Sequence, residues 1–222
     1  MSSNHNFLRW FRGATAATKP EETPARGPRT ARRCVGLAEF MRDLRGSEDQ
    51  KPCALDLGPT SPANITFLAD RHLRVYNENI LRGAMDPAIR TSRDDGTDGL
   101  DLEKFFASNL AYQDRHFDAI LCWDAADYLP EELVKPVVEK LHRMLKPKGT
   151  LLAFFHTRDA GAESPYCRYH IVQPDTIELE QAAGFRLQRI FNNRHIENLF
   201  KDFSSRRFFL GRDNIREVIL VR

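Results

Sequence analysis

The chain has 222 residues, which is long enough to bury its own hydrophobic core and favours one folded domain over two. Hydrophobic residues make up 41% and charged residues 29%, ordinary values that exclude collagen-like, low-complexity and wholly disordered classes. No apolar run approaches the roughly 20 residues that span a bilayer. The four cysteines form no C-x-x-C pair and no cluster with histidine, so the sequence predicts neither a metal site nor a disulfide framework, and the expected compartment is cytoplasmic.

The net charge of +2 is unevenly placed along the chain. Residues 1–34 carry seven basic and two acidic side chains, a net charge of +5, so the remaining chain carries about −3. Few apolar groups accompany the basic ones, and we expect residues 1–30 to be a disordered basic tail ahead of a domain at residues 31–222. A slightly acidic domain has no electrostatic footprint for nucleic acid, which argues against such a partner.

The first half of the predicted domain alternates helices and strands. A helix is expected from Ala31 with Gly46 as its stop, and a short buried strand follows at residues 52–57. After a turn at residues 58–62 comes a helix whose inner face should carry Ile65, Leu68 and Ala69, and then a strand at residues 73–79. Strand, helix and strand in this order form a crossover unit and predict a parallel sheet.

The second half is expected to continue the same sheet after a polar stretch, residues 80–99, that has no clear assignment. The remaining predicted elements are a helix at 101–109, a central strand at 117–123, a long helix at 130–146, a buried strand at 150–155, an irregular segment at 157–184, a strand at 185–191, a helix around 196–203, and strands at 206–210 and 216–221. Turn-forming residues at 211–214 predict that the last two strands pair as a hairpin. An irregular segment of that length in a compact domain is usually functional.

Three runs along the chain point to a ligand site. Residues 54–58 (ALDLG) end the first strand, residues 117–124 (FDAILCWD) form the central strand, and residues 141–152 (LHRMLKPKGTLL) join the long helix to the next strand. Ligands of open α/β sheets lie beyond the carboxyl ends of the strands. A glycine there lets a ligand approach the backbone, and an acidic residue before it can accept hydrogen bonds under the site.

These runs resemble the class I S-adenosylmethionine-dependent methyltransferases. In that family a strand ending in D-x-G-x-G-x-G opens the cofactor site, an F-D-x-I strand forms its floor, and a helix ending in L-K-P-G-G leads into the next strand. The resemblance covers residues 50–156 and extends to the closing helix and hairpin at 192–222. It implies an α/β fold with a Rossmann-like, doubly wound, mostly parallel sheet and a C-terminal antiparallel hairpin, and it implies S-adenosylmethionine as cofactor.

Cofactor-binding residues follow from the same resemblance. Asp56 and Gly58 match the first motif and would contact the amino-acid end of the cofactor. The family places an acid on the ribose hydroxyls at the end of the second strand, where this chain has Glu78 and Asn79, and either residue fits that role.

The loop after the first strand departs from the family pattern. Its second and third glycines are absent, and Pro59 removes an N–H and stiffens the turn. Two readings follow: the loop holds the cofactor through Thr60, Ser61 and the amides of the next helix, or the pocket has closed and binding is lost. The same loop lacks the G-x-G-x-x-G cradle for a pyrophosphate, which argues against NAD.

The substrate side of the site is expected around and after the fourth and fifth strands. Trp123 and Asp124 would line the floor between cofactor and substrate. Segment 157–184 is interpreted as a lid or a substrate-side insertion. The residues that could bind or deprotonate an acceptor are His156, just after the fifth strand, and Tyr166, Tyr169 and His170 within the segment.

Three functions remain open at this level. The first, which we predict, is an enzyme that methylates a small-molecule or protein acceptor. The second is a methyltransferase fold without catalysis that serves as a binding or scaffolding module. The third is a nucleic-acid methyltransferase, for which the basic tail is the hint. The run at residues 124–128 (DAADY) is not the N/D-P-P-Y/F signature of amino-group methylation, which weakens the third function.

Overall fold

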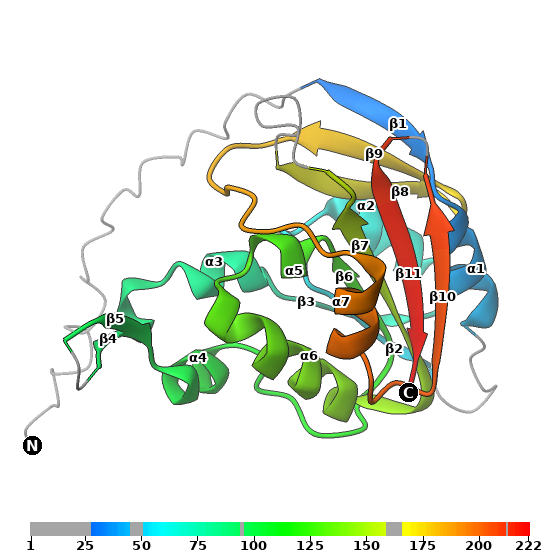
Figure 1. The fold of residues 1–222 in the computed structure, drawn as a ribbon. Coiled ribbons are helices and arrows are strands. Elements are labelled where there is room, and N and C mark those ends of the chain that lie inside the picture. The colour runs from blue at the N-terminus through cyan, green and yellow to red at the C-terminus, as the bar shows by residue number, and fades with distance from the viewer. Residues whose placement is uncertain (1–27, 45–50, 94–95, 159–165, 212) are drawn as a thin grey trace, which may run out of the picture.

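The structure is a computed structural model, and it describes residues 28–44, 51–93, 96–158, 166–211 and 213–222. Its centre is a six-stranded sheet with the strand order β10-β11-β7-β6-β2-β3 (Figure 1). The bounds are β2 Cys53–Asp56, β3 Arg74–Asn77, β6 Phe117–Trp123, β7 Leu145–His156, β10 Ser205–Leu210 and β11 Ile215–Val221. Strands β3, β2, β6 and β7 run parallel, whereas β11 and β10 are antiparallel to their neighbours. This confirms the predicted mostly parallel sheet with a C-terminal hairpin.

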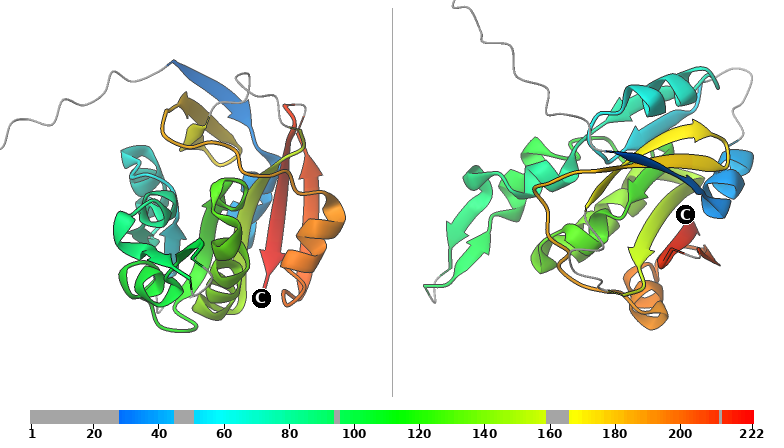
Figure 2. Two further views of the ribbon diagram at one scale, coloured as in Figure 1. Left: turned by 60° about the vertical axis from the view of Figure 1, so that its left-hand side comes forward. Right: turned by 90° about the horizontal axis from the view of Figure 1, so that it is seen from above.

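Helices cover both faces of this sheet, as the two views in Figure 2 show. One face is buried against α3 to α7 and the other against α1 and α2, which gives two separate hydrophobic clusters. Strand β6 is apolar almost throughout because it is covered on both sides. The helices are α1 Val35–Asp43, α2 Pro62–Ala69, α3 Ile80–Ala84, α4 Leu102–Ser108, α5 Ala125–Tyr128, α6 Glu131–Met144 and α7 Asn193–Leu199. Within the described ranges no helix is both long and apolar enough to cross a membrane.

A second sheet of three strands lies above the carboxyl edge of the parallel strands, at the top of Figure 1. Its order is β1-β9-β8, from β1 Arg29–Arg33, β9 Thr176–Gln181 and β8 Cys167–Gln173, and both pairings are antiparallel. The prediction of an irregular segment at 157–184 is therefore wrong for these two strands. The sequence of β8 shows no alternation of apolar and polar residues. One face of this strand packs against the core, and the other makes hydrogen bonds with residues of the site.

The start of the domain also differs from the prediction. Residues 31–33, expected in a helix, belong to β1, and the expected tail boundary at residue 30 falls inside the same strand. Helix α1 begins only at Val35, after Cys34 accepts a hydrogen bond from the N–H of Leu37. Residues 1–27 and Gly46 lie outside the described residues. Pairing with β9 overrides the helical spacing at Ala31, since tertiary partners outweigh weak local propensity.

In its described residues, 80–93 and 96–99, the polar stretch after β3 contributes no strand to the central sheet. It folds as α3, a 3-10 turn η1 at Pro87–Ile89, and a separate hairpin of β4 Arg90–Ser92 and β5 Asp98–Leu100. Strand β3 is consequently the edge of the six-stranded sheet.

Two further predictions are wrong in detail. Residues 185–191 form no strand but an extended segment, fixed where the N–H of Gln188 donates to the carbonyl of Asp127 at 2.9 Å. On α2, Ile65 and Ala69 are exposed, and the buried side chains are those of Asn64, Phe67 and Leu68. The polar Asn64 replaces an apolar residue on the buried face because β8 packs there and supplies hydrogen-bonding partners.

Candidate functional site

The candidate site lies where β2, β6 and β7 end beneath the second sheet. Asp56 is the last residue of β2, and its side chain is 1% exposed. Its Oδ1 accepts from the N–H of Gly58 at 3.0 Å and from Nε1 of Trp123 at 2.7 Å, while its Oδ2 accepts from Nδ2 of Asn64 at 2.8 Å. Burial raises the pKa of Asp56, and these three donors act against that rise. Both carboxylate oxygens of Asp56 are thus engaged by the protein itself.

Trp123, the last residue of β6, turns its ring over the loop that follows β2. Its backbone is left-handed, with a φ of 50°, which is uncommon for a bulky residue. The indole stacks on the ring of Tyr169 with centroids 5.0 Å apart, and the edge of Phe154 closes another side at 5.5 Å. A Cβ added at Gly58 would lie 3.2 Å from the indole, so a side chain there would require the indole to shift by a few tenths of an ångström.

Asp124 begins the turn after β6 and is the strongest electrostatic feature of the site. Its carboxylate accepts from the hydroxyl of Tyr169 at 2.6 Å and is 2% exposed. Burial raises the pKa of Asp124 to about 7, and the neighbouring His156 and the Tyr169 hydroxyl work against that rise. Burial and the same carboxylate raise the pKa of the Tyr169 phenol well above its usual value. This carboxylic acid therefore changes its charge near neutral pH.

A second buried carboxyl group, that of Asp127, contacts the histidine at the end of β7. Oδ2 of Asp127 is 2.9 Å from Nδ1 of His156 and accepts the backbone N–H of the same histidine at 2.7 Å. Burial raises the pKa of Asp127. The rings of Tyr128 and Tyr166 meet edge to face at 5.2 Å, and Tyr128 also contacts His156 at 5.9 Å. A carboxylate on Nδ1 makes Nε2 the basic atom of this imidazole when it is neutral.

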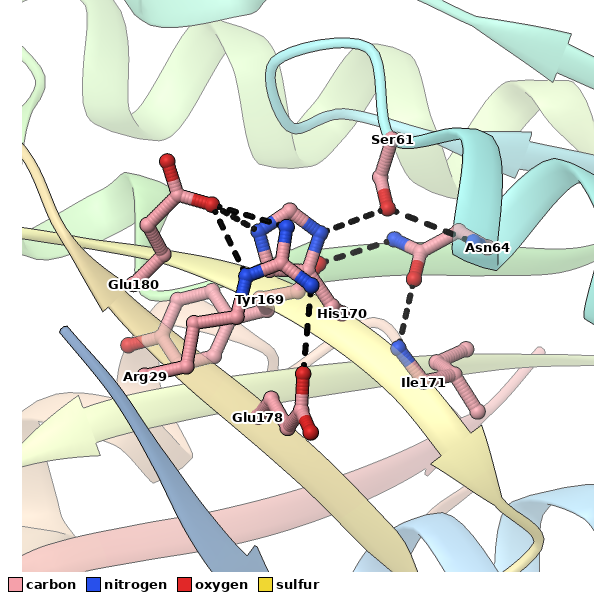
Figure 3. A network of polar contacts seen from close by, with 8 residues as sticks. All are labelled: Arg29, Ser61, Asn64, Tyr169, His170, Ile171, Glu178 and Glu180. Atoms are coloured by element: carbon pink, nitrogen blue, oxygen red, sulfur yellow. Dashed lines mark hydrogen bonds and ion pairs between the residues drawn. The ribbon is translucent and has the colours of Figure 1, made fainter. Parts of the chain in front are cut away.

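His170 lies apart from this pair, on the side of β8 that faces α2 (Figure 3). Its Nδ1 is 2.8 Å from Oγ of Ser61, and its Nε2 is 3.0 Å from Oε2 of Glu180. Ser61 caps α2 by accepting the N–H of Asn64 at 3.3 Å, and Arg29 of β1 binds the same Glu180 oxygen at 3.0 Å. This chain of contacts joins the loop after β2 to all three strands of the second sheet.

The residues expected at the ribose end are occupied by structural contacts. Oε1 of Glu78 accepts the N–H of Leu110 at 2.6 Å, and burial raises the pKa of this carboxyl. Asn79 caps α3 by accepting the N–H of Arg82 at 3.2 Å. Thr60 donates to the side-chain oxygen of Asn77 at 2.6 Å, which holds the loop against the end of β3.

The predicted site residues therefore fall into three groups. The first converges on one buried point and consists of Asp56, Gly58, Trp123, Asp124 and Tyr169. The second consists of His156, which lies beside this point, and Tyr166, which lines the hollow there. The third supports the surroundings and consists of Thr60, Glu78, Asn79 and His170. The hollow at the point of convergence holds about 10 Å³, room for one water molecule at most.

Two important residues were not predicted from the sequence. Asn64 donates to Asp56 and to the carbonyl of Tyr169 at 3.1 Å, and its oxygen accepts the N–H of Ile171 at 2.7 Å. Asp127 sits in the run at residues 124–128, but nothing local separates a buried carboxylate from a solvated one. A buried polar residue on a helix is recognisable only when its partners, here on β8 and β7, are known.

A larger groove, of about 510 Å³, lies between α6, α7 and residues 188–191. Among its lining residues are Val134, Arg189, Phe191 and Leu199, and it includes none of the predicted site residues.

Comparisons with known proteins give one family match. Residues 55–153, slightly less than half of the chain, match the family described as a methyltransferase domain. A search of curated proteins finds no relative of the sequence.

Similar solved structures include a 1,6-didemethyltoxoflavin-N1-methyltransferase from Burkholderia thailandensis with bound substrate and S-adenosylhomocysteine (10% identity, 84% of this chain and 77% of that one, TM-score 0.43). Another is a SAM-dependent methyltransferase from Methanosarcina mazei (15% identity, 83% and 96% covered, TM-score 0.47). A third is a possible histamine N-methyltransferase from Thermotoga maritima (10% identity, 84% and 88% covered, TM-score 0.42).

The matched segment spans β2 to β7, the elements that carry Asp56, Gly58, Trp123 and Asp124. The family match is thus to a methyltransferase domain, and it includes four of the residues predicted to bind the cofactor.

Proposed function

We propose that this protein transfers a methyl group to a small-molecule or protein acceptor that binds at the carboxyl ends of β6 and β7. The family match supports methyl transfer in general. The placement of the acceptor rests on two adjacent pairs of buried ionisable side chains, Asp124 with Tyr169 and Asp127 with His156. S-adenosylmethionine supplies an activated methyl group when it is bound, so the protein has to position the acceptor and manage its proton.

The observation that carries this proposal is the burial of ionisable groups at one edge of the sheet. Asp124 and Asp127 are 2% and 0% exposed, although burying a carboxylate is costly. Perturbed pKa values of this kind concentrate at functional sites, where they serve proton transfer. His156 is held by two contacts with Asp127, which orients its ring as a proton acceptor for an oxygen or nitrogen of the acceptor.

The arrangement of the cofactor position itself does not fit the amino-acid end of S-adenosylmethionine. Sites for ligands of this size typically enclose about 300–1,000 Å³, whereas the hollow beside Gly58 holds about 10 Å³. Asp56, which the family resemblance assigns to that end, has both oxygens bonded to Trp123, Asn64 and the Gly58 amide. A bound cofactor requires a different position of the indole.

The proposal is tested by following transfer of a labelled methyl group from S-adenosylmethionine to fractionated small molecules and to peptides. The variant is His156→Ala, and the matched control is His195→Ala, an exposed histidine on α7. Loss of a positioned base lowers the rate by roughly 10²–10⁴-fold, so the first variant should lose transfer while the second keeps it. Transfer that is equal in both variants would refute the role of His156, and no transfer to any fraction would refute the proposed activity.

The filled cofactor position favours one alternative, a methyltransferase fold that binds a partner without catalysis. Trp123 and Tyr169 form a closed aromatic stack exactly where an open pocket would be needed, and such packing stabilises a scaffold. A folded protein that shows neither cofactor binding nor methyl transfer in any variant would support this alternative over the enzyme.

A further inference from the structure

The cofactor position contains a side chain of the protein itself. Nε1 of Trp123 donates to Oδ1 of Asp56 at 2.7 Å, the carboxylate that the resemblance assigns to the amino-acid end of the cofactor. The indole is 3% exposed and lies over Gly58, the glycine of the same motif. An N–H donor and a flat apolar body therefore stand where a ligand with an ammonium group would stand.

Two rings hold the indole in this place. Tyr169 stacks on it with an interplanar angle of 10°, and Phe154 contacts both rings edge to face, at 5.5 Å and 5.4 Å. Tyr169 is fixed in turn by its hydroxyl, which donates to Asp124. The indole and the phenol are therefore one unit that joins the end of β6 to β8.

Strand β8 is bonded to the helix that follows the cofactor loop. Asn64 of α2 contacts the carbonyl of Tyr169 and the N–H of Ile171, and Ser61 contacts His170 (Figure 3). These contacts fix the backbone of β8 relative to α2 and the loop, and so they set where the ring of Tyr169 begins.

We propose that the Trp123–Tyr169 pair is an internal plug that competes with S-adenosylmethionine for Asp56, so that the cofactor binds only after the indole has left. This inference rests on the proposed function for the identity of the ligand. A protein whose competent state is rare binds with an apparent affinity reduced by the fraction of that state. Removing the indole should remove that reduction.

The test is calorimetric titration of S-adenosylhomocysteine into the full chain and three variants. Trp123→Ser removes the plug and should bind at least tenfold more tightly than the wild type. His195→Ala, an exposed change on α7, leaves the stack intact and should bind as the wild type does. Asp56→Ala should abolish binding by the Trp123→Ser protein. Circular dichroism checks that each variant is folded.

A second readout uses the tryptophan content of the chain. Trp10 and Trp123 are its two tryptophans, so Trp10→Phe leaves Trp123 as the sole tryptophan, which is excited selectively at wavelengths that tyrosine does not absorb. A saturating concentration of S-adenosylhomocysteine should shift its emission to longer wavelength as the indole moves from a 3% exposed position into water.

Two results would overturn the plug. Micromolar binding by the wild type that is unchanged or weaker in Trp123→Ser, with unshifted emission, would make the indole a wall of the pocket while leaving the proposed function intact. The absence of binding in both folded proteins would show that the indole is not what excludes the cofactor, and it would count against the proposed function as well.

Discussion

Replacing Asp124 by asparagine should change how the stability of this protein depends on pH. The buried carboxyl has a pKa of about 7 in the folded protein against 3.8 for the unperturbed group. Between these two values the folded state keeps a proton that the unfolded state has lost, so stability falls as the pH rises from about 4 to about 7 and then levels off. Asparagine has nearly the same shape, can still accept from the Tyr169 hydroxyl, and has no proton to lose.

The size of the effect follows from the shift. One pKa unit corresponds to about 1.4 kcal/mol, so between pH 4.5 and pH 8 this single carboxyl removes about 3 kcal/mol of the free energy of unfolding. The free energy of unfolding of Asp124→Asn minus that of the wild type should therefore rise by about 3 kcal/mol over this range. Urea unfolding at several pH values, followed by circular dichroism, measures that difference.

A matched control has the opposite sign. Asp101 caps α4 by accepting the N–H of Lys104 at 3.0 Å, which lowers the pKa of this exposed carboxyl. Stability from a lowered pKa is present above the unfolded value and is lost as the pH falls, so Asp101→Asn should be most destabilising at neutral pH. If the difference between Asp124→Asn and the wild type stays constant within about 1 kcal/mol from pH 4.5 to pH 8, the buried carboxyl is not shifted as described.

Four further substitutions test the packing of the fold, each measured by urea unfolding at pH 7. Arg32→Ala leaves the 2% exposed Glu217 without the guanidinium at 2.8 Å and should cost about 3–5 kcal/mol, whereas a cost below about 1 kcal/mol would mean that water replaces the guanidinium. Asn64→Ala removes three hydrogen bonds between α2, β2 and β8 and should cost about 2–4 kcal/mol, and a neutral result would show that β8 is not held by this residue. On the same helix Ile65→Ala should cost less than about 0.5 kcal/mol and Leu68→Ala about 2–5 kcal/mol, with equal costs contradicting the orientation of α2.

The sequence was sufficient for the parts of the fold that repeat a strong local signal. Strand β6 was predicted at its exact bounds because a run buried on both faces is apolar without interruption. The hairpin of β10 and β11 followed from turn-forming residues between two short strands. Both patterns depend only on neighbours in sequence.

The second sheet could not be predicted in the same way. Strand β1 pairs with β9 across about 150 residues of chain, and its only buried position is Arg32. A strand with four exposed residues and one buried arginine has no hydrophobic alternation, so its spacing was read as the start of a helix. The partners that make this strand stable, on β9 and β11, are remote in sequence.

The candidate site was predicted as a set of residues but not as an arrangement. The strand ends brought Asp56, Gly58, Trp123 and Asp124 together, as parallel strands require. The prolines of the loop after β2 leave a closed pocket as one alternative. In the structure the side chains of Trp123 and Tyr169 fill the position beside this loop. An aromatic residue at a strand end is compatible with a wall and with a plug. The contact of Trp123 with Asp56 favours the plug that we propose, and titration of the Trp123→Ser variant distinguishes the two.

The location of β1 has a practical consequence for anyone who shortens this protein. Cutting at residue 31, where composition alone places the end of the tail, would remove Arg29 and Thr30 and with them part of the strand that covers β9. The backbone of β9 would then be an open edge, and Glu178 and Glu180 would lose the arginine that bridges them. Exposed edges of this kind pair with other chains. Aggregation of such a shortened protein would reflect the missing strand and would say nothing about the basic residues before it.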